Sequence, residues 1–233
     1  MLLKTKNLMK AFGGLKAINK VDFELPAGEI RGIIGPNGSG KSTFFNLVSG
    51  VYDPDPGSYI EFDGHDITNE PPHKIGALGL SRTFQLLRLY QDMSVINNVM
   101  SGYHTRVKYK FFDAVIGRKK IWDQEKEIKD EMMELLSFVG LADYAELNAS
   151  ELSGGQRRLL VLARAIAMKP KLLMLDEPAA GLSPVNVDNL MKIIMQLKDK
   201  YGLTLIIIEH ILKVVMDTCN TVTVLDHGQK IAE

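Results

Sequence analysis

Two segments near the N-terminus alternate apolar and polar residues, which is the pattern of half-buried strands. Residues 2–8 and 18–25 follow it, and a period of two predicts antiparallel strands with one solvated face. After a turn at residues 26–28, residues 30–34 form a third expected strand, and residues 59–64 form another strand with its turn. We therefore expect mainly β-structure in the first part of the chain.

The pattern changes to a helical period at about residue 86. Residues 80–84 are expected to form a short strand that ends at Gln85. Farther on, residues 123–139 have many charges, and between them apolar residues recur at helical spacing: Ile128, Met132, Leu135, Leu136 and Val139. Since residues 86–168 show no clear strand pattern, we predict that they form a helical insert.

Unbroken apolar runs mark the last third of the chain. Residues 171–176, 203–208 and 222–225 are such runs, which are typical of buried parallel strands covered on both faces. A helical pattern at residues 187–200 separates the first two, and alternating strands and helices predict an α/β core with a parallel sheet. We expect a single domain, 1–233, with its α/β core in residues 1–85 and 169–233 and a helical subdomain in 86–168.

Composition and charge argue against a nucleic-acid partner. Lys and Arg number 28 together, as do Asp and Glu, whereas a general nucleic-acid binder has a basic excess. The single cysteine, Cys219, cannot form an internal disulfide, which favours a reducing compartment and a buried, inert side chain. No signal peptide begins the chain, and no run approaches the ~20 apolar residues that span a bilayer. We expect a soluble chain.

A glycine-rich loop lies between the expected strand at residues 30–34 and a predicted helix at 42–48. Its sequence, GPNGSGKS, matches the pattern G-x-x-x-x-G-K-[ST] in full. In such a loop the backbone N–H groups surround phosphate oxygens, the lysine reaches the outer phosphates, and the hydroxyl suits Mg²⁺. Lys41 is also predicted to be catalytic and Ser42 to bind the metal. The predicted nucleotide site here comprises Gly35, Pro36, Asn37, Gly38, Ser39, Gly40, Lys41, Ser42 and Thr43.

Two carboxylates, Asp176 and Glu177, end the apolar run at residues 171–176. Ligands of open α/β sheets bind at the carboxyl ends of the strands, and successive side chains of a strand point in opposite directions. The two residues are therefore expected to have different roles. Asp176 is predicted to bind Mg²⁺, and Glu177 is predicted to polarise the attacking water.

A second glycine motif, LSGGQ at residues 152–156, opens an amphipathic helix that is expected to reach Ala167. Ser153 and Gln156 form an S-x-x-Q capping box. The box leaves Gly154 and Gly155 unexplained, although each costs about 1 kcal/mol against alanine. An anion at the helix N-terminus would explain them. Because the chain already has a phosphate loop, we expect these four residues to bind the nucleotide of a second copy.

With these motifs the chain resembles the ATP-binding cassette (ABC) ATPases over nearly its whole length. The resemblance implies a RecA-like P-loop NTPase core with an antiparallel β subdomain, ATP and Mg²⁺ as ligands, and two cassettes that meet head to tail. It implies that Gln85 senses the metal and the γ-phosphate, as a catalytic and metal-binding residue, and that catalytic His210 contacts the γ-phosphate. By themselves these would be a surface glutamine and a helix-start histidine. Phe12 is expected to stack on adenine, with a core aromatic as the alternative.

A finer resemblance rests on SRTFQ at residues 81–85, FFD at 111–113 and EPAAGLSP at 177–184. These segments resemble the LivG-type cassette of branched-chain amino acid importers, and the related urea and amide importers share much of the pattern. The resemblance implies an ATPase on the inner face of the cell membrane, which acts on permease subunits through the region after Gln85 and on a solute receptor indirectly. Ser183 departs from the aspartate usual in the wider family, which puts carboxylate signalling across the dimer in doubt. Relatives usually continue beyond residue 233, so a truncated form is possible.

Three other functions fit the sequence less well. An ABC ATPase that works on nucleic acid or ribosomes would have two cassettes or long coiled-coil inserts. A nucleotide switch without hydrolysis would not need intact Lys41, Asp176, Glu177 and His210. A lipid-transport or export cassette is the nearest alternative, and SRTFQ favours import. The solute stays open, as does whether the two paired cassettes are identical, although the resemblance implies two different ones.

Overall fold

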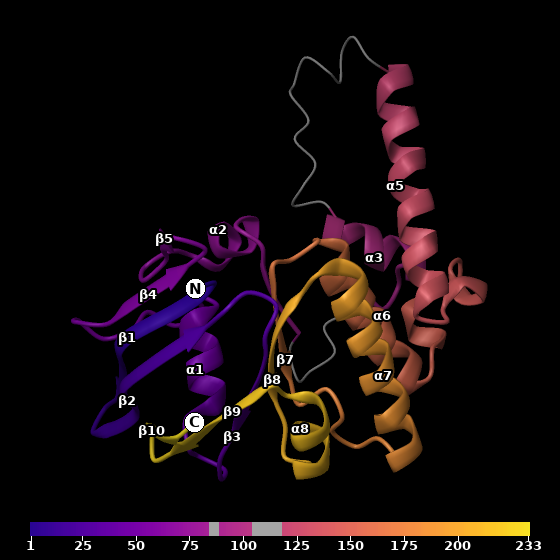
Figure 1. The fold of residues 1–233 in the computed structure, drawn as a ribbon. Helices are drawn as coiled ribbons and strands as arrows, with labels where there is room; N and C mark the ends of the chain where they lie inside the picture. The colour runs from indigo at the N-terminus through magenta and orange to yellow at the C-terminus, as the bar shows by residue number, and fades with distance from the viewer. Residues whose placement is uncertain (84–88, 104–117) are drawn as a thin grey trace. The chain divides into compact units, whose positions relative to one another are not determined.

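The computed structural model describes residues 1–83, 89–103 and 118–233 (Figure 1). These residues belong to two compact units, which we call unit 1 (residues 1–85 and 171–233) and unit 2 (residues 86–170). Unit 1 contains both β-sheets, and unit 2 is mainly helical. In the part of the chain that the structure describes, no helix is long and apolar enough to cross a membrane.

The smaller sheet of unit 1 is antiparallel and has the strand order β2-β1-β4-β5. The strands predicted at residues 2–8, 18–25 and 59–64 are confirmed. β1 is longer than predicted because it continues to a two-residue turn, at which Phe12 pairs with Leu15. The bounds are Leu3–Phe12 (β1), Leu15–Leu25 (β2), Tyr59–Phe62 (β4) and His65–Asp66 (β5).

The larger sheet of unit 1 has the order β10-β9-β3-β8-β7-β6, in which all neighbours are parallel except β10 and β9. β7 and β8 are buried throughout, as predicted. The prediction of a third fully buried strand is wrong, because β9 lies beside the edge strand β10 and buries only alternate residues. The bounds are Ile30–Ile34 (β3), Leu80–Arg82 (β6), Leu172–Asp176 (β7), Thr204–Ile208 (β8), Thr221–Asp226 (β9) and Gln229–Ala232 (β10).

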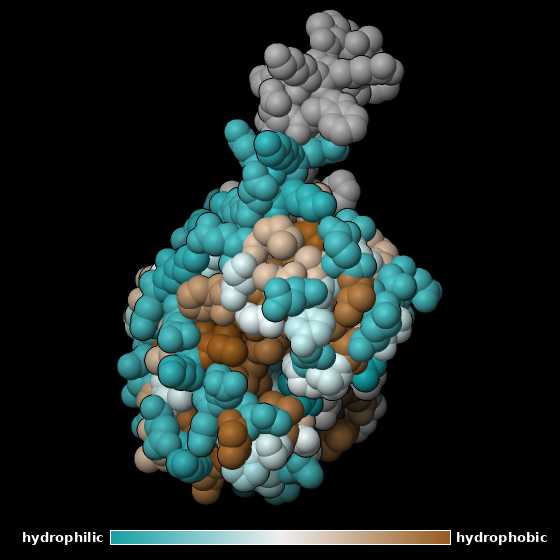
Figure 2. Space-filling model, turned by 90° about the vertical axis from the view of Figure 1, so that its right-hand side faces the viewer, coloured by the Kyte–Doolittle hydropathy of each residue, from teal (hydrophilic) through white to brown (hydrophobic). Residues whose placement is uncertain are grey.

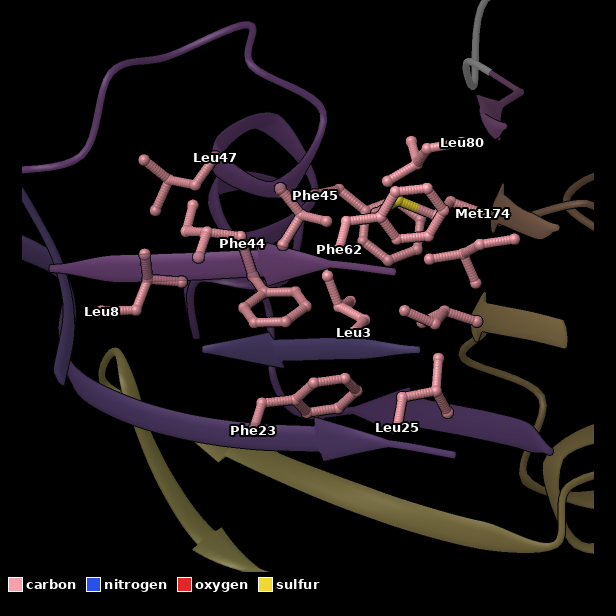
Figure 3. Packing of buried hydrophobic residues seen from close by; sticks show 14 of the residues in the cluster. Leu3, Leu8, Phe23, Leu25, Phe44, Phe45, Leu47, Phe62, Leu80 and Met174 are labelled. Carbon is pink, nitrogen blue, oxygen red and sulfur yellow. The ribbon is translucent and has the colours of Figure 1, made fainter. Parts of the chain in front are cut away.

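Helix α1 (Lys41–Val48) shares one hydrophobic core with both sheets. Figure 3 shows its phenylalanines among side chains of the smaller sheet, where the rings of Phe44 and Phe23 meet edge to face with centroids 5.1 Å apart. Met174 of β7 and Leu80 of β6 join the same cluster. Because α1 is held on its apolar side, the loop that precedes it is fixed in place.

Three further helices complete unit 1. They are α2 (Pro72–Ala77), which the sequence did not predict, α7 (Pro184–Tyr201) and α8 (Leu212–Thr218). α8 packs closely on β3, since a Cβ atom at Gly32 would lie 2.9 Å from Val215 Cγ1 and 3.0 Å from Cys219 Sγ. Cys219 is half-buried, and this burial raises the pKa of its thiol.

Unit 2 contains the helices α3 (Val95–Tyr103), α5 (Arg118–Phe138) and α6 (Gly154–Ala167), with two 3₁₀ turns at Ala142–Tyr144 and Ala149–Glu151. α3 and α6 cross closely, because a Cβ atom at Gly102 would lie 2.3 Å from the Arg164 carbonyl oxygen. The helix predicted at residues 123–139 is confirmed, although Ile128 is only half-buried. Figure 2 shows hydrophilic residues along the part of α5 below the grey atoms.

Candidate active site

A pocket of about 390 Å³ lies in unit 1 at the carboxyl end of β3. Its volume is in the range of small-molecule sites. The residues that line it come from the loop before α1 and the first turn of α1, from the end of β1 and the start of β2, and from the segments that follow β7, β8 and β9. They are Phe12, Leu15, Lys16, Ala17, Asn37, Gly38, Ser39, Gly40, Lys41, Ser42, Thr43, Glu177, His210 and His227.

The loop of residues 35–42, which we call the phosphate loop, needs glycine at two positions. Gly40, at the N-cap of α1, has φ +104°, and a Cβ atom there would lie 2.5 Å from the Ala17 carbonyl oxygen. At Gly35 a Cβ atom would lie 2.1 Å from the Leu225 carbonyl oxygen. Any side chain would force the loop away from β2 and β9. The glycines therefore keep the loop against the sheets, with the N-terminus of α1 at the pocket.

Lys41 lies in the phosphate loop with its ammonium turned back on the loop. Its Nζ donates to the carbonyl oxygens of Gly35, at 2.8 Å, and of Pro36, at 2.9 Å. Burial lowers the pKa of Lys41, whereas the carboxylates of Glu177 and Asp176 act in the opposite direction. A buried cation of this kind is best stabilised by an anion. Gly35 and Pro36 thus belong to the site through their carbonyls, although they do not line the pocket.

Glu177 and His210 meet at the edge of the pocket. The Oε1 atom of Glu177 lies 2.9 Å from Nε2 of His210. Glu177 directly follows the buried strand β7, and His210 comes shortly after the buried strand β8. Glu177 has φ +49°, a left-handed conformation that is uncommon for a residue other than glycine. The contact joins the ends of β7 and β8 and places a carboxylate beside the phosphate loop.

Asp176 is predicted to bind the metal but does not line the pocket. Its Oδ2 atom accepts a hydrogen bond of 2.9 Å from Arg82 in an ion pair whose side chains are 8% and 7% exposed. Arg82 also donates to Asn46 Oδ1 at 2.6 Å and lies 5.3 Å from the Phe45 ring centroid. Arg82, at the end of β6, therefore fixes Asp176 against α1. Nothing in the sequence alone pointed to this pair.

Phe12 is not a core residue. Its side chain is 45% exposed and lines the pocket. The ring of Tyr52 meets it edge to face, with centroids 5.4 Å apart and an angle of 74° between the rings. Lys10 Nζ lies 5.6 Å from the Phe12 ring centroid. The ring is thus supported from the side and partly open to solvent, which leaves a face for a planar ligand.

The second glycine motif is the N-terminus of α6 in unit 2. The predicted capping box is confirmed: Gln156 N–H donates to Ser153 Oγ at 3.3 Å, and Ser153 N–H donates to Gln156 Oε1 at 2.9 Å. Around Gly154 and Gly155 nothing in the described chain lies within 4 Å of an added Cβ atom. Packing inside the described chain therefore gives no reason for the two glycines.

Comparison with known protein families gives a match over most of the chain. The ABC transporter family model matches residues 18–180. The chain belongs to the ABC transporter family. It is an ATP-binding cassette with the P-loop NTPase fold of its family, and such cassettes are ATP-hydrolysing enzymes.

Two named relatives match nearly all of this ABC cassette. A probable branched-chain amino acid transport ATP-binding protein, LivG, of Archaeoglobus fulgidus is 42% identical. The match covers 100% of this chain and 88% of that protein. LivG of Escherichia coli strain K12, a high-affinity branched-chain amino acid transport ATP-binding protein, is 37% identical, with 99% of this chain covering 90% of its length. Both similarities therefore extend over nearly the whole of this chain and most of each relative.

Solved cassettes have the same fold as this ABC cassette. A structure described as the ADP conformation of an ATP-binding cassette of an ABC transporter superposes with a TM-score of 0.85 at 35% identity, covering 99% of this chain and 89% of that one. A nucleotide-free ATP-binding cassette superposes with a TM-score of 0.84 at 34% identity, covering 99% and 90%. The α/β fold predicted from the sequence is confirmed.

Some predicted site residues of this ABC cassette lie outside the described residues, and some pocket residues were not predicted from the sequence. Gln85 and the FFD segment at residues 111–113 are outside the described residues. Leu15, Lys16, Ala17 and His227 line the pocket but were not predicted. Leu15, Lys16 and Ala17 belong to β2, and His227 lies in the turn between β9 and β10. No local motif marks any of them. His227 is at the pocket because Gly228 N–H donates to the Ser39 carbonyl oxygen at 3.0 Å.

Proposed function

We propose that this chain is the ATP-hydrolysing cassette of an importer for branched-chain amino acids. The observation that carries the proposal is the 2.9 Å contact between Glu177 and His210 at the edge of the pocket that the phosphate loop lines. At this position the Glu177 carboxylate can accept a proton from a water molecule, and the His210 imidazole can contact a phosphate of the same bound nucleotide. The solute class is taken from the relatives of 35–42% identity, which are branched-chain amino acid transport ATP-binding proteins.

The side chains of the pocket divide the work of hydrolysis. The backbone N–H groups of the phosphate loop and Lys41 bind the phosphates, and Phe12 stacks on the adenine. Glu177 accepts the proton of the attacking water as the water oxygen bonds to the γ-phosphorus and the bond to the bridging oxygen breaks. His210 orients the Glu177 carboxylate and contacts the γ-phosphate. A correctly placed base contributes roughly 10²–10⁴ in rate, and the rest comes from holding the charges of the transition state.

The residues present fit Mg²⁺ as a partner of the nucleotide. Ser42, which carries a hydroxyl, lines the pocket. Asp176, directly before the pocket residue Glu177, has a carboxylate that Arg82 holds in position. Among the described residues no cluster of three acidic, histidine or cysteine side chains forms a complete metal site. This suits Mg²⁺, which binds through one or two protein oxygens together with substrate phosphates. When bound, the ion would neutralise charge on the β- and γ-phosphates.

The working form is a pair of cassettes. The pocket draws all its lining residues from unit 1, whereas Ser153, Gly154, Gly155 and Gln156 form an open helix N-terminus in unit 2. We infer that this N-terminus binds the ATP of a second cassette, identical or different. ATP then favours the closed pair, and hydrolysis removes the contact that holds it closed. The region after Gln85 transmits this motion to permease subunits in the membrane, which a solute receptor supplies.

Uptake of a labelled solute tests this function. A strain without the gene should lose leucine uptake, and the wild-type gene should restore it. Glu177→Gln should fail to restore uptake, and the purified variant should bind ATP with turnover lowered roughly 10²-fold or more. Glu61→Gln, which changes a carboxylate in the smaller sheet away from the pocket, should behave as wild type. Restored uptake of urea or a short amide instead of leucine would overturn the solute assignment.

A further inference from the structure

Glu209 is a carboxylate buried beside the catalytic pair. It directly follows β8, precedes His210 and is 3% exposed. It does not line the pocket, and among the described residues no cation forms an ion pair with it. Buried carboxylates without a cationic partner are rare because desolvation is costly. The hydrogen bonds that Glu209 makes must therefore stabilise its charge.

Within residues 1–83, 89–103 and 118–233, two backbone N–H groups donate hydrogen bonds to Glu209. Glu209 Oε1 accepts from Ala179 N–H at 2.7 Å, and Glu209 Oε2 accepts from His210 N–H at 3.2 Å. Ala179 is itself buried, at 1% exposure, and follows Glu177 by two residues. Hydrogen bonds to an ionised acceptor are stronger than those between neutral groups. One carboxylate thus binds both the segment after β7 and the segment after β8.

Two other contacts join the same two segments. Glu177 N–H donates to the Ile208 carbonyl oxygen at 2.9 Å, and the side chains of Glu177 and His210 meet at 2.9 Å. Glu177 holds its left-handed conformation between them. A non-glycine residue keeps such a conformation only where its surroundings fix it. Of these three contacts, only the hydrogen bond from Ala179 N–H to Glu209, which we call the Ala179 anchor, is made by a buried side chain.

We infer that Glu209 is a positioning residue, which holds residues 177–179 and thereby sets the contact between Glu177 and His210. It acts through Glu177 and does not touch the nucleotide. The inference rests on the proposed role of Glu177 as the base that accepts the proton of water. A displacement of about 1 Å of such a base can cost about 10² in rate, so the position of a backbone segment matters for turnover.

Substitutions at position 209 separate turnover from binding. Glu209→Ala removes both acceptor oxygens and should lower kcat about 10²-fold, with the Kd for ATP changed by no more than about twofold. Glu209→Gln keeps an oxygen that can accept from Ala179 N–H, and should retain more activity than the alanine variant. The matched control is Glu29→Gln, because Glu29 accepts from Arg31 and Thr221 at the opposite end of β3. It should keep wild-type kcat.

Hydrogen exchange of the Ala179 amide, followed by NMR, gives a readout that does not depend on activity. Exchange should be faster in Glu209→Ala than in wild type, and unchanged in Glu29→Gln. In a His210→Ala background, Glu209→Ala should add little further loss of kcat, since the contact it sets is already gone. If Glu209→Ala keeps wild-type kcat, or if it and Glu29→Gln lose activity and ATP affinity alike, the inference is wrong. If Glu177→Gln alone keeps full turnover, the proposed mechanism fails, while the Ala179 exchange still reports on the anchor.

Discussion

Lys41 has little exposed surface, although it lines the pocket. Its side chain donates to two carbonyls of its own loop, and burial lowers its pKa although Glu177 and Asp176 lie near enough to oppose this. Phosphate oxygens would be better acceptors than neutral carbonyls because they are charged. At the scale of single residues, unit 1 thus has the Lys41 cation, the Glu177 carboxylate and the open Phe12 ring around one pocket.

Phe12 allows the adenine contact to be tested separately from the phosphate contacts. Phe12→Ala should weaken ATP binding about tenfold, since stacking of a base on an aromatic ring is worth about 1–3 kcal/mol. Binding of inorganic tripolyphosphate should not change, because it has no base. Isothermal titration calorimetry measures both affinities. Leu15→Ala, at another exposed apolar residue of the pocket, is the control and should have a smaller effect, whereas equal losses for ATP and tripolyphosphate would exclude the stacking role.

At the scale of elements, the N-terminus of α6 combines a satisfied cap with two unexplained glycines. Ser153 and Gln156 exchange hydrogen bonds, so they have a structural reason to be there. Gly154 and Gly155 have positions open enough for a Cβ atom, so helix stability would favour alanine at both. An element that keeps glycines against its own stability is suited to a close approach by another molecule.

Gly155→Ala should therefore have opposite effects on stability and on activity. The variant should be more stable by up to about 1 kcal/mol, seen as a higher Tm in calorimetry. Its ATPase rate should nevertheless fall, because the new methyl group stands where the nucleotide of the second cassette approaches. Gly140→Ala is not a suitable control, since Gly140 has φ +74°. Ser137→Ala, at an exposed position late in α5, is suitable and should leave ATPase activity unchanged. A Gly155→Ala variant with full activity would contradict the assignment of the motif to ATP.

At the scale of the whole molecule, the proposed site is complete only in a pair of cassettes. One chain contributes the phosphate loop, Glu177 and His210, all in unit 1. In the proposed pair, the partner contributes the N-terminus of its α6. Two defects placed on different chains should then compensate each other, which a site contained in one chain would not allow.

Mixing two inactive variants tests this sharing. The Lys41→Ala chain should not bind ATP in its own phosphate loop. The Ser153→Arg chain should bind its own ATP but should prevent hydrolysis of the ATP that its partner binds. Mixed at equal amounts, they should recover roughly a quarter of the wild-type rate, because half of the pairs are mixed and each has one complete site. Activity that appears only after a different cassette is added would assign the second signature to that cassette. A mixture that stays inactive with either partner would contradict the shared site.

The sequence by itself determined the local motifs and the class of fold. The phosphate loop, the capping box and the acidic end of β7 are each contiguous, so their spacing and their strand or helix context suffice to predict them. Buried central strands such as β7 and β8 were also readable, because burial on both faces leaves an unbroken apolar run. β5, α2 and β10 were missed since they are short. β9 was taken for fully buried because its place beside the edge strand β10 is a property of the assembled sheet.

The tertiary structure decided which distant residues meet. Arg82 pairs with Asp176, Ala179 N–H donates to Glu209, and His227 reaches the phosphate loop through the hairpin of β9 and β10. Each of these contacts joins two parts of unit 1 that are separated in sequence, and no local spacing encodes them. A parallel sheet brings the carboxyl ends of its strands to one edge, so the strand order, which appears only on folding, determines which side chains share the pocket.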